Sequence, residues 1–362
     1  MTYSEAGVDI ERAESALQRL IARVKGTWPS GGGLGAVMLD IGYFANVVDI
    51  GGVGLAITTD GVGSKVLVAQ MVGKYDTVGI DCVAMNVNDL LCVGARPLTL
   101  VDYLAVQDPS PDLLDAISIG LAEGARQAGV SIPGGEIAQL REVVQGVRDG
   151  LGFDLAASAV GLVPLDRIIV GQAVMEGDVL VGLESNGIHS NGLTLAREVL
   201  LGSGRYSVDS PFPGAPDNGA APTIGEELLR PTFIYVPEIL AMMDQGVSLK
   251  ALMHVTGDGF LNLNRVDAAV GFVIEQLPEP PAIFSLIQHT GAIRDAEMYR
   301  VFNMGVGFCV VVPPEDAERA IEIAAAHGRR AQRIGRAIAD PERRITIEPL
   351  GLVSKGKRFV RR

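Results

Sequence analysis

An acidic, glycine-rich turn directly follows an apolar run near residue 60, and it constrains the fold more than any other segment. The run Leu55–Ile57 ends at Asp60, so a buried strand gives way to a turn that carries a carboxylate. Gly61 and Gly63 let backbone amides approach an anion without a Cβ in the way, and Lys65 adds a positive charge within the same reach. This chemistry favours a nucleoside triphosphate with magnesium, although the same glycine pattern also occurs in ordinary turns.

A second group of polar residues interrupts the apolar segment 79–94. Asp81, Asn88 and Asp89 have a spacing that suits a helix. At about 3.6 residues per turn, Asp81 and Asn88 lie near one face and Asp89 is turned away by about 100°. Such groups are costly to bury unless they coordinate a cation or accept hydrogen bonds. The segment therefore predicts a cation site, and the alternative is that Asn88 and Asp89 only cap a helix.

The composition is typical of a compact α/β enzyme. The chain has 362 residues, 48% of them hydrophobic and 20% charged, with 45 glycines, which is enough for two domains with full cores. The formal net charge of −13 argues against a nucleic-acid-binding surface, which needs clustered Lys and Arg. The one basic concentration, at residues 355–362, is expected to be a solvated terminal tail.

The cysteines and the first twenty residues indicate where the protein resides. Cys82, Cys92 and Cys309 have no paired spacing, which predicts apolar packing in a reducing compartment rather than a zinc site or disulfides. The early acidic residues exclude a signal peptide, and no uncharged apolar run reaches membrane length. We expect a soluble, cytoplasmic protein with no membrane partner.

Predicted strands and helices alternate along the chain. Helices are expected at 10–24 and 111–128, and strands at 55–59, 97–104 and 155–163. The glycine-rich segment 28–35 is either a lid over phosphates or a plain linker. Because residues 164–171 interrupt the pattern before a new strand, we place a domain boundary near 167, between domains 1–167 and 168–362.

Two further turns carry polar groups. Glu136 is expected just beyond a short apolar strand, where it would be a third acid facing a metal. Residues 184–192 place small hydroxyl and amide donors before a helix predicted at 193–200, and that position favours an anion such as a phosphorylated substrate. His189 in this turn is either a structural hydrogen-bonding group or a catalytic one. Regular structure is expected to resume from 228 to 243.

Together these segments resemble the aminoimidazole ribonucleotide synthetase family, also called phosphoribosylformylglycinamidine cyclo-ligase, in order across nearly the whole chain. The matching pieces are Y-x-x-A-G-V-D-I at 3–10, T-D-G-V-G-S-K at 59–65, G-I-D-x-V-A-M-x-V-N-D at 79–89, G-G-E at 134–136, S-x-G-I-H-S-N-G at 185–192, H-V-T-G at 254–257, P-x-I-F at 281–284 and F-N-M-G-V-G at 302–307. The pieces at 185–192 and 302–307 favour this family over superfamily relatives such as thiamine-monophosphate kinase and selenide water dikinase.

The chain departs from the family pattern at several positions. Ile137, Gln139 and Arg141 stand at or near the usual Thr, second Glu and Pro, and Asp258 stands where the family usually has glycine. These changes would alter metal or substrate affinity. Ser64 replaces the usual Thr and keeps the hydroxyl group.

The resemblance implies an α/β (α+β) subunit of two domains and an ATP-dependent reaction. An N-terminal ferredoxin-like sheet would pair with that of a second subunit to form a central barrel in a homodimer, with a C-terminal α/β domain beside it. The implied reaction of purine biosynthesis converts formylglycinamidine ribonucleotide and ATP to aminoimidazole ribonucleotide, ADP and phosphate. ATP phosphorylates the formamide oxygen, and a nitrogen then attacks that carbon to close the ring. Such chemistry needs positioning and charge neutralisation more than a covalent nucleophile.

The resemblance also suggests roles for the residues of the motifs. The magnesium ligands would be Asp60, Asp81, Asp89 and Glu136. ATP would be bound by these acids together with Gly31, Gly32, Gly33, Gly35, Gly61, Gly63, Ser64, Lys65, Asn88 and Gly135. The ribonucleotide would be bound by Ser185, His189, Ser190, Asn191 and Thr256, and the catalytic residues would be His189, Lys65 and Asp81.

Two alternatives remain at this point: another small-molecule kinase of the superfamily, and a non-catalytic dimeric ATP-binding module. We also expect Asp81→Asn to leave stability little changed or improved, because it removes one buried negative charge.

Overall fold

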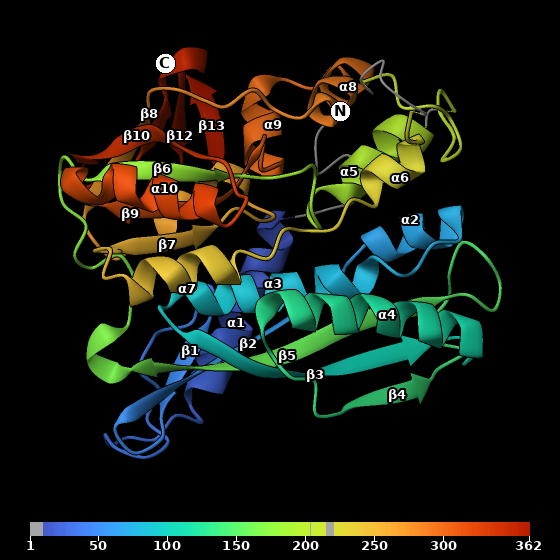
Figure 1. The fold of residues 1–362 in the computed structure, drawn as a ribbon, viewed down its shortest axis with the longest axis horizontal. Helices are drawn as coiled ribbons and strands as arrows, with labels where there is room; N and C mark the ends of the chain where they lie inside the picture. The colour runs from blue at the N-terminus through green and yellow to red at the C-terminus, as the bar shows by residue number, and fades with distance from the viewer. Residues whose placement is uncertain (1–9, 203, 215–220) are drawn as a thin grey trace.

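Two β-sheets, one from each half of the chain, are joined through a central helix (Figure 1). The computed structural model describes the backbone of residues 10–202, 204–214 and 221–362, and side chains from residue 16 onward in these ranges. The motif matched at 3–10 therefore lies outside the described side chains.

The first sheet is open and has five strands in the order β1-β2-β5-β3-β4. All neighbouring strands are antiparallel except β3 and β4, which are parallel. Residues alternate between its two faces, so that Ala56 and Thr58 are buried while Ile57 and Thr59 are exposed. Its strands are β1 (Asn46–Asp49), β2 (Val53–Gly61), β3 (Arg96–Val106), β4 (Gly135–Gln139) and β5 (Phe153–Pro164).

Helix α3 (Val78–Cys92) lies between the first sheet and the second half of the chain. It packs against β2, β3 and β5 on one side and against β7 (Ala251–His254) and α7 (Val236–Asp244) on the other. Every residue of α3 is buried except Ile80 and Asp89, as expected for a helix that is apolar nearly all round. Helix α4 (Pro111–Ala128) packs along α3 over the same sheet face.

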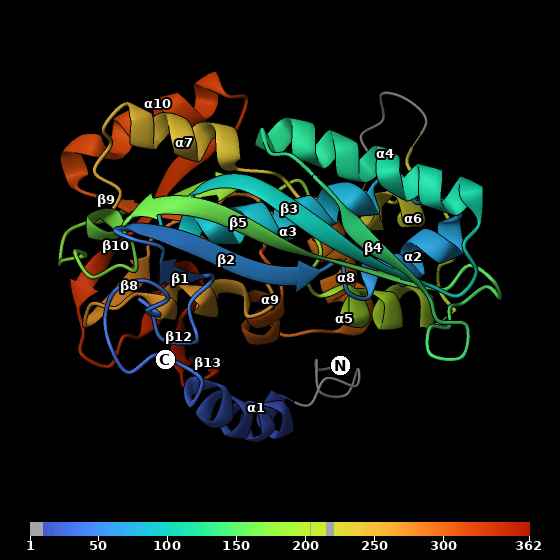
Figure 2. The same ribbon diagram turned by 90° about the horizontal axis from the view of Figure 1, so that it is seen from below.

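No helix of the described part of the chain lies over the opposite face of the first sheet (Figure 2). Ile57 on β2 and Val101 and Tyr103 on β3 expose 38%, 46% and 45% of their surface there. Large apolar side chains grouped on one exposed sheet face mark an interaction surface. We call this surface the outer sheet face.

The second sheet has eight strands in the order β13-β12-β11-β8-β10-β6-β9-β7. The central strands β6 and β9 are apolar and buried nearly throughout, as is typical of a sheet covered on both faces. The strands not yet given are β6 (Val179–Glu184), β8 (Val270–Ile274), β9 (Val306–Val312), β10 (Ala331–Ala339), β11 (Ile345–Ile347), β12 (Leu352–Lys355) and β13 (Arg358–Arg361).

The remaining helices surround the two sheets and the junction between them (Figures 1 and 2). A π-helical turn (Glu198–Gly202) continues α5, and short 3₁₀ turns occupy Leu165–Arg167, Gly259–Arg265, Pro314–Asp316 and Glu348–Leu350. The helices are α1 (Ile10–Lys25), α2 (Lys65–Val72), α5 (Leu193–Arg197), α6 (Ile224–Leu228), α8 (Ala282–Gly291), α9 (Asp295–Val301) and α10 (Ala317–Ala326).

The structure confirms the three predicted strands of the first sheet and the helices expected at 10–24, 111–128 and 193–200. Three local predictions are wrong. Regular structure does not run from 228 to 243, because residues 229–235 form an irregular segment between α6 and α7. Glu136 lies within β4 rather than beyond a strand. The basic residues 355–362 belong largely to the hairpin β12–β13 rather than to a solvated tail.

The three cysteines are free and buried, as predicted. Among the described residues, every helix is too short or too polar to cross a lipid bilayer.

Close packing of α3 on α4 depends on Gly79. A Cβ added at this position would lie 2.2 Å from the Leu121 backbone nitrogen. We expect Gly79→Ala to lower the free energy of unfolding by about 1–3 kcal/mol or more. The reason is that backbone atoms cannot move aside as a flexible side chain can. Urea unfolding would measure this. Gly134→Ala is the control, since its Cβ would meet no atom within 4 Å, and equal effects of the two substitutions would contradict the prediction.

Candidate active site

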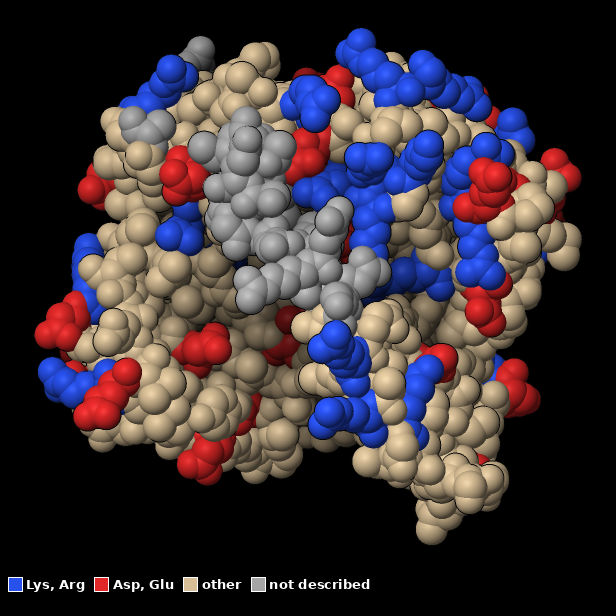
Figure 3. All heavy atoms as spheres, turned by 180° about the vertical axis from the view of Figure 1, so that it is seen from behind, with Lys and Arg blue, Asp and Glu red and all other residues tan. Residues whose placement is uncertain are grey.

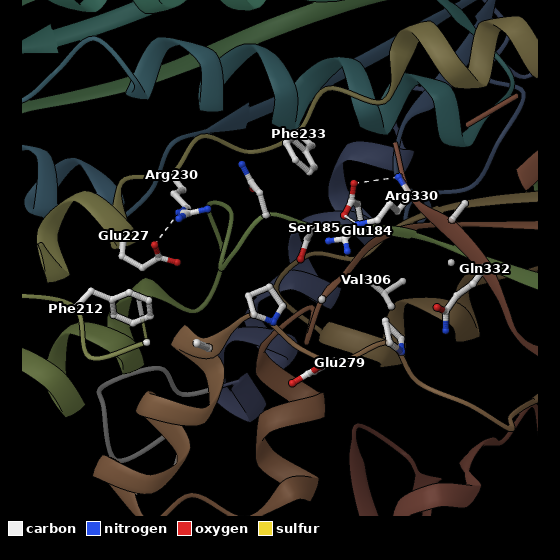
Figure 4. Close-up of a pocket in the computed structure, with 18 of the residues that line it drawn as sticks. Glu184, Ser185, Phe212, Glu227, Arg230, Phe233, Glu279, Val306, Arg330 and Gln332 are labelled. Atoms are coloured by element: carbon white, nitrogen blue, oxygen red, sulfur yellow. Dashed lines mark hydrogen bonds and ion pairs between the residues drawn. The ribbon is translucent and has the colours of Figure 1, made fainter. Parts of the chain in front are cut away.

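The irregular segment 229–235 lies at the junction of the two halves of the chain. On one side its backbone is held by polar side chains of α2 and α3. On the other side Arg230 and Phe233 line a cavity in the second half of the chain (Figure 4). The segment therefore connects the polar residues around α3 to that cavity.

A buried ion pair fixes the start of this segment. Lys65 and Asp81 have no exposed side-chain surface, and the distance from Lys65 Nζ to Asp81 Oδ2 is 2.8 Å. The lysine also donates to the Arg230 carbonyl at 2.6 Å, while Asp81 Oδ1 accepts from the Thr232 amide and hydroxyl, each at 2.7 Å. Burial lowers the pKa of Lys65, and Asp81 opposes this shift.

This geometry gives both residues a structural part that the sequence did not predict. As placed, Lys65 has no surface open to a phosphate and Asp81 has none open to a metal ion. Instead, their charges neutralise each other inside the protein and join α2, α3 and the segment 229–235.

Asn88 holds the other end of the segment. Its Nδ2 donates to the Phe233 carbonyl at 2.8 Å, and its Oδ1 accepts from the Tyr235 amide at 3.0 Å. Asn88 is fully buried, so its amide binds the backbone and not the predicted nucleotide. The helical spacing correctly predicted that Asp81 and Asn88 share a face, but that face meets protein and not an ion.

Asp60 and Asp89 are the acids that remain partly open at the junction. Asp60 lies at the end of β2, where its amide donates to Asn86 Oδ1 at 3.1 Å. Asp89 Oδ1 lies 2.9 Å from His254 Nδ1, and the Asp89 side chain is 13% exposed. Burial, followed by repulsion from Asp89, raises the pKa of Asp60. Two carboxylates in this position attract a cation.

His189 belongs to the turn 184–192, and its side chain lies in an aromatic cluster. Its side chain is buried and packs edge-on against Phe233 at a ring distance of 6.0 Å, and burial holds the pKa of His189 well below its ordinary value. Its imidazole is therefore neutral at pH 7. Its backbone has φ of +65°, a conformation that residues other than glycine rarely adopt. The arrangement is the one that a structural role predicts.

Gly307 makes room for this cluster. A Cβ there would lie 2.0 Å from Tyr235 Oη and 2.7 Å from His189 Cε1. Gly307 is the second glycine of the F-N-M-G-V-G motif. Its lack of a side chain makes room for His189 to pack, rather than for a direct contact with an anion.

The cavity that Arg230 and Phe233 line has a volume of about 780 Å³ and lies beside the turn 184–192. Ser185 lines it, with its hydroxyl 2.7 Å from Asn303 Oδ1. Two ion pairs stand on its walls, Arg230 with Glu227 at 2.7 Å and Arg330 with Glu184 at 2.6 Å, and Figure 4 shows both pairs near Ser185. A cavity of this size with paired charges suits a polar, charged small molecule.

The other residues predicted to bind the ribonucleotide lie toward the junction and do not line the cavity. Ser190 Oγ is 3.2 Å from Thr232 Oγ1, and Asn191 Nδ2 is 3.8 Å from Met85 Sδ. A Cβ at Gly257, next to Thr256, would lie 3.2 Å from Asn191 Oδ1, so these two turns are adjacent. Ser64 of the first turn reaches the same region through Thr194 Oγ1, at 3.0 Å.

Two predicted parts of the nucleotide site are not brought to Asp60 within one chain. Asp60 and Gly135 lie in one row across the sheet but three strand spacings apart, or about 14 Å, so Glu136 cannot share an ion with Asp60. The exposed glycine loop 31–35 is bonded through the Gly35 amide to Asp49, which is paired with Gly54, about 20 Å along β2 from Asp60. Consistent with this separation, the described residues contain no cluster of three or more metal-binding side chains.

Sequence reasoning missed several residues that build the site. Thr232 and Arg230 lie in a segment that was expected to be regular, and no local pattern marks them as partners of Asp81 and Lys65. Asn86 was only a variable position within a motif. Arg329 packs over the Phe233 ring, with 3.5 Å between guanidinium and centroid, although the two are far apart in sequence.

Comparison with known proteins identifies relatives over almost the full length. The model of the AIR synthase related protein N-terminal domain matches residues 42–163, and that of the C-terminal domain matches residues 175–348. The phosphoribosylformylglycinamidine cyclo-ligase of Methanothermobacter thermautotrophicus is 48% identical over 335 residues, which cover 92% of this chain and 94% of that protein. The protein of the same name from Thermococcus kodakarensis is 45% identical, over 97% of this chain and 99% of the relative.

Solved structures share the fold at lower identity. The tt0281 protein of Thermus thermophilus superposes with a TM-score of 0.61 at 23% identity, over 91% of this chain and 95% of that one. AaThiL, complexed with AMPPCP and TMP, gives a TM-score of 0.59 at 17% identity, over 85% and 88% of the two chains. These similarities show a mixed α/β fold of two domains.

The buried ion pair also reverses the effect expected for Asp81→Asn. Because the substitution leaves Lys65 charged, buried and uncompensated, we now expect a loss of about 3–5 kcal/mol in the free energy of unfolding. Urea unfolding would measure it. The double variant Lys65→Met/Asp81→Asn removes the unpaired charge and should recover much of the loss. If Asp81→Asn were as stable as the wild type, the ion pair would not be the main contribution of Asp81.

Proposed function

The chain belongs to the AIR synthase related family and, within it, to the phosphoribosylformylglycinamidine cyclo-ligases, and we propose that it closes the imidazole ring of aminoimidazole ribonucleotide in purine biosynthesis. This confirms the family expected from the motifs. The observation that carries the proposal is the length of the similarity to cyclo-ligases, together with a junction that combines two open acids and a small-molecule cavity. The enzyme would use formylglycinamidine ribonucleotide and ATP and release ADP and phosphate.

Asp60 and Asp89 suit a magnesium ion that accompanies ATP. Mg²⁺ commonly binds one or two carboxylates and completes its shell with water and phosphate oxygens. Burial and the neighbouring Asp89 raise the pKa of Asp60, and a bound cation would stabilise its charged form. When bound, the ion would neutralise charge on the phosphates, and the protein's part is to hold both carboxylates at the end of β2 and on α3.

The ribonucleotide would bind in the cavity beside Ser185. The guanidinium groups of Arg230 and Arg330 supply hydrogen-bond donors for a phosphorylated substrate next to Ser185, whose own hydroxyl proton is donated to Asn303. Ser190, Asn191 and Thr256 would bind its reacting end at the junction, nearer to Asp60. His189 would hold the turn 184–192 in position, because its neutral ring is buried and shielded from solvent.

A homodimer would complete the nucleotide site. The glycine loop 31–35 lies at the β1 edge of the first sheet, and Glu136 lies at the β4 edge. Pairing of two outer sheet faces, with the β1 edge of one chain near the β4 edge of the other, would bury the exposed apolar side chains and bring these groups together. The dimeric barrel, and a location in the cytoplasm, are parts of the proposal.

The reaction is tested by ADP release from purified protein. We expect release only when formylglycinamidine ribonucleotide, ATP and Mg²⁺ are all present, with one ADP per ring closed. Equal release with thiamine monophosphate would contradict the proposed acceptor. No release with any acceptor, despite ATP binding, would favour the non-catalytic module.

The substitution Asp60→Asn is expected to change activity and stability in opposite directions. The raised pKa means that the folded protein holds this proton more tightly than the unfolded chain, so stability falls as pH rises above the ordinary range of an Asp carboxyl. At neutral pH, Asp60→Asn should therefore raise the melting temperature while it lowers kcat about 10²–10³-fold, the loss typical of one contact to transition-state charge. Asp115→Asn, at an exposed position on α4, is the control and should change neither quantity. Full activity in Asp60→Asn would refute the metal assignment.

Substitution on the outer sheet face tests the dimer. Ile57→Asp places a charge in the middle of the proposed interface and should yield monomers, because an unpaired buried charge is costly. Light scattering at low micromolar concentration would show the change in mass. Ile119→Asp, on the exposed surface of α4, is the matched control and should remain dimeric. A wild-type protein that is folded and active as a monomer would rule out the proposed assembly.

A further inference from the structure

The C-terminal residues form a basic surface that the proposed reaction does not use. Residues 343–362 include seven Lys and Arg side chains and a single Glu, in a protein with a formal net charge of −13. Most of these cations lie on or beside the hairpin of β12 and β13, at one edge of the second sheet. Figure 3 shows Lys and Arg gathered on the side of the molecule that holds this edge.

A cavity opens beside the hairpin. Its volume is about 610 Å³, within the range of about 300–1,000 Å³ that is usual for small-molecule sites. Its polar lining is Asn264, Arg343, Arg344, Ser354, Lys355 and one acid, Glu342, which lies 3.3 Å from Arg344. The volume suits a ligand of the size of a sugar phosphate or a nucleotide.

Two cations oppose each other across the hairpin without a carboxylate between them. Lys355 pairs directly with Arg358 in the strand register, on the face that also carries Val353 and Val360, and these two valines line the cavity. Both cationic side chains are exposed, and neither forms an ion pair with any described residue. Like charges directly opposite on antiparallel strands are destabilising. An anion bound between the two would remove this repulsion.

Two other residues of the cavity are set up for a ligand. Arg343 has φ of +53°, in the left-handed region that residues other than glycine rarely adopt and that often marks functional sites. Asn264 Oδ1 is buried and accepts no hydrogen bond from the residues that the structure describes. A hydroxyl group of a bound molecule would satisfy it.

Protection of the sheet edge does not account for all of these charges. Cations on an outer strand prevent edge-to-edge association, and this explains Arg358 and Arg361 on β13. Lys355 lies on β12, which has strands on both sides. Its position opposite Arg358 therefore requires another explanation.

We propose that this cavity binds a phosphorylated small molecule, with its phosphate between Lys355 and Arg358 and a hydroxyl group near Asn264. The site is distinct from the cavity proposed for the ribonucleotide, because no residue lines both cavities. A nucleic acid suits it less well, since phosphate chains need an extended basic surface and most of this chain is acidic.

Inorganic pyrophosphate is the probe, because it carries the phosphate charge without a base or sugar. Calorimetric titration at low salt would count the pyrophosphate bound per chain in the wild type, in Lys355→Glu and in the control Arg361→Glu. The control makes the same charge change on the same hairpin, but on its other face. We expect Lys355→Glu to bind one pyrophosphate fewer per chain than Arg361→Glu, while both keep the wild-type rate of ring closure.

Thermal unfolding provides a second readout. Without pyrophosphate, Lys355→Glu should melt higher than Arg361→Glu, because a like-charge pair with Arg358 becomes an opposite-charge pair. Pyrophosphate should then raise the melting temperature less in Lys355→Glu. Equal stoichiometry and equal melting shifts in the two variants would overturn the proposal, as would Lys355-dependent binding of single-stranded RNA in a protein that binds no pyrophosphate at this site. Because the measurements are of binding, failure of the proposed reaction would leave them unaffected.

Discussion

The buried contact between Lys65 and Asp81 holds the two halves of this protein in register. Taking two charges out of water is costly, and hydrogen bonds to the remaining donors and acceptors offset part of that cost. Here the partners come from the opposite half of the chain: the Arg230 carbonyl and the amide and hydroxyl of Thr232. Apolar packing alone would tolerate small shifts between the halves, whereas these directional bonds do not.

The consequence is that the segment 229–235 is held by hydrogen bonds at both ends. Asn88 fixes its far end by bonding two backbone groups, and the Arg329 guanidinium packs on the Phe233 ring between the fixed ends. Side chains of the same segment then line the cavity. The polar residues of α3 thus contribute to the site indirectly, by holding the backbone that carries it.

Asp60 and Asp89 are the acids that remain partly exposed at the junction beside α3. Asp89 is, with Ile80, the only residue of α3 that is not buried, and it lies beside Asp60 and His254. Among the described residues neither acid pairs with a Lys or Arg, which is a stability cost that functional sites commonly carry. The opposite condition holds at the C-terminal hairpin, where Lys355 and Arg358 face each other and neither forms an ion pair with a described residue. In both places the charge left over indicates the sign of the expected ligand.

Local patterns in the sequence were enough to predict the strands at 55–59, 97–104 and 155–163, the main helices, the position of Asp60 where a strand ends, and the family. These features depend on backbone preferences and on burial that alternates with a period of 2 or 3.6 residues, and both are properties of neighbouring residues. Only the tertiary structure decided which polar groups meet: that Asp81 pairs with Lys65 and Thr232, that Asp60 lies near Asp89 but about 14 Å from Gly135, and that the basic terminus folds into a hairpin. Such contacts join residues as many as 165 positions apart, and they follow from strand register and helix packing, which no short stretch of sequence specifies.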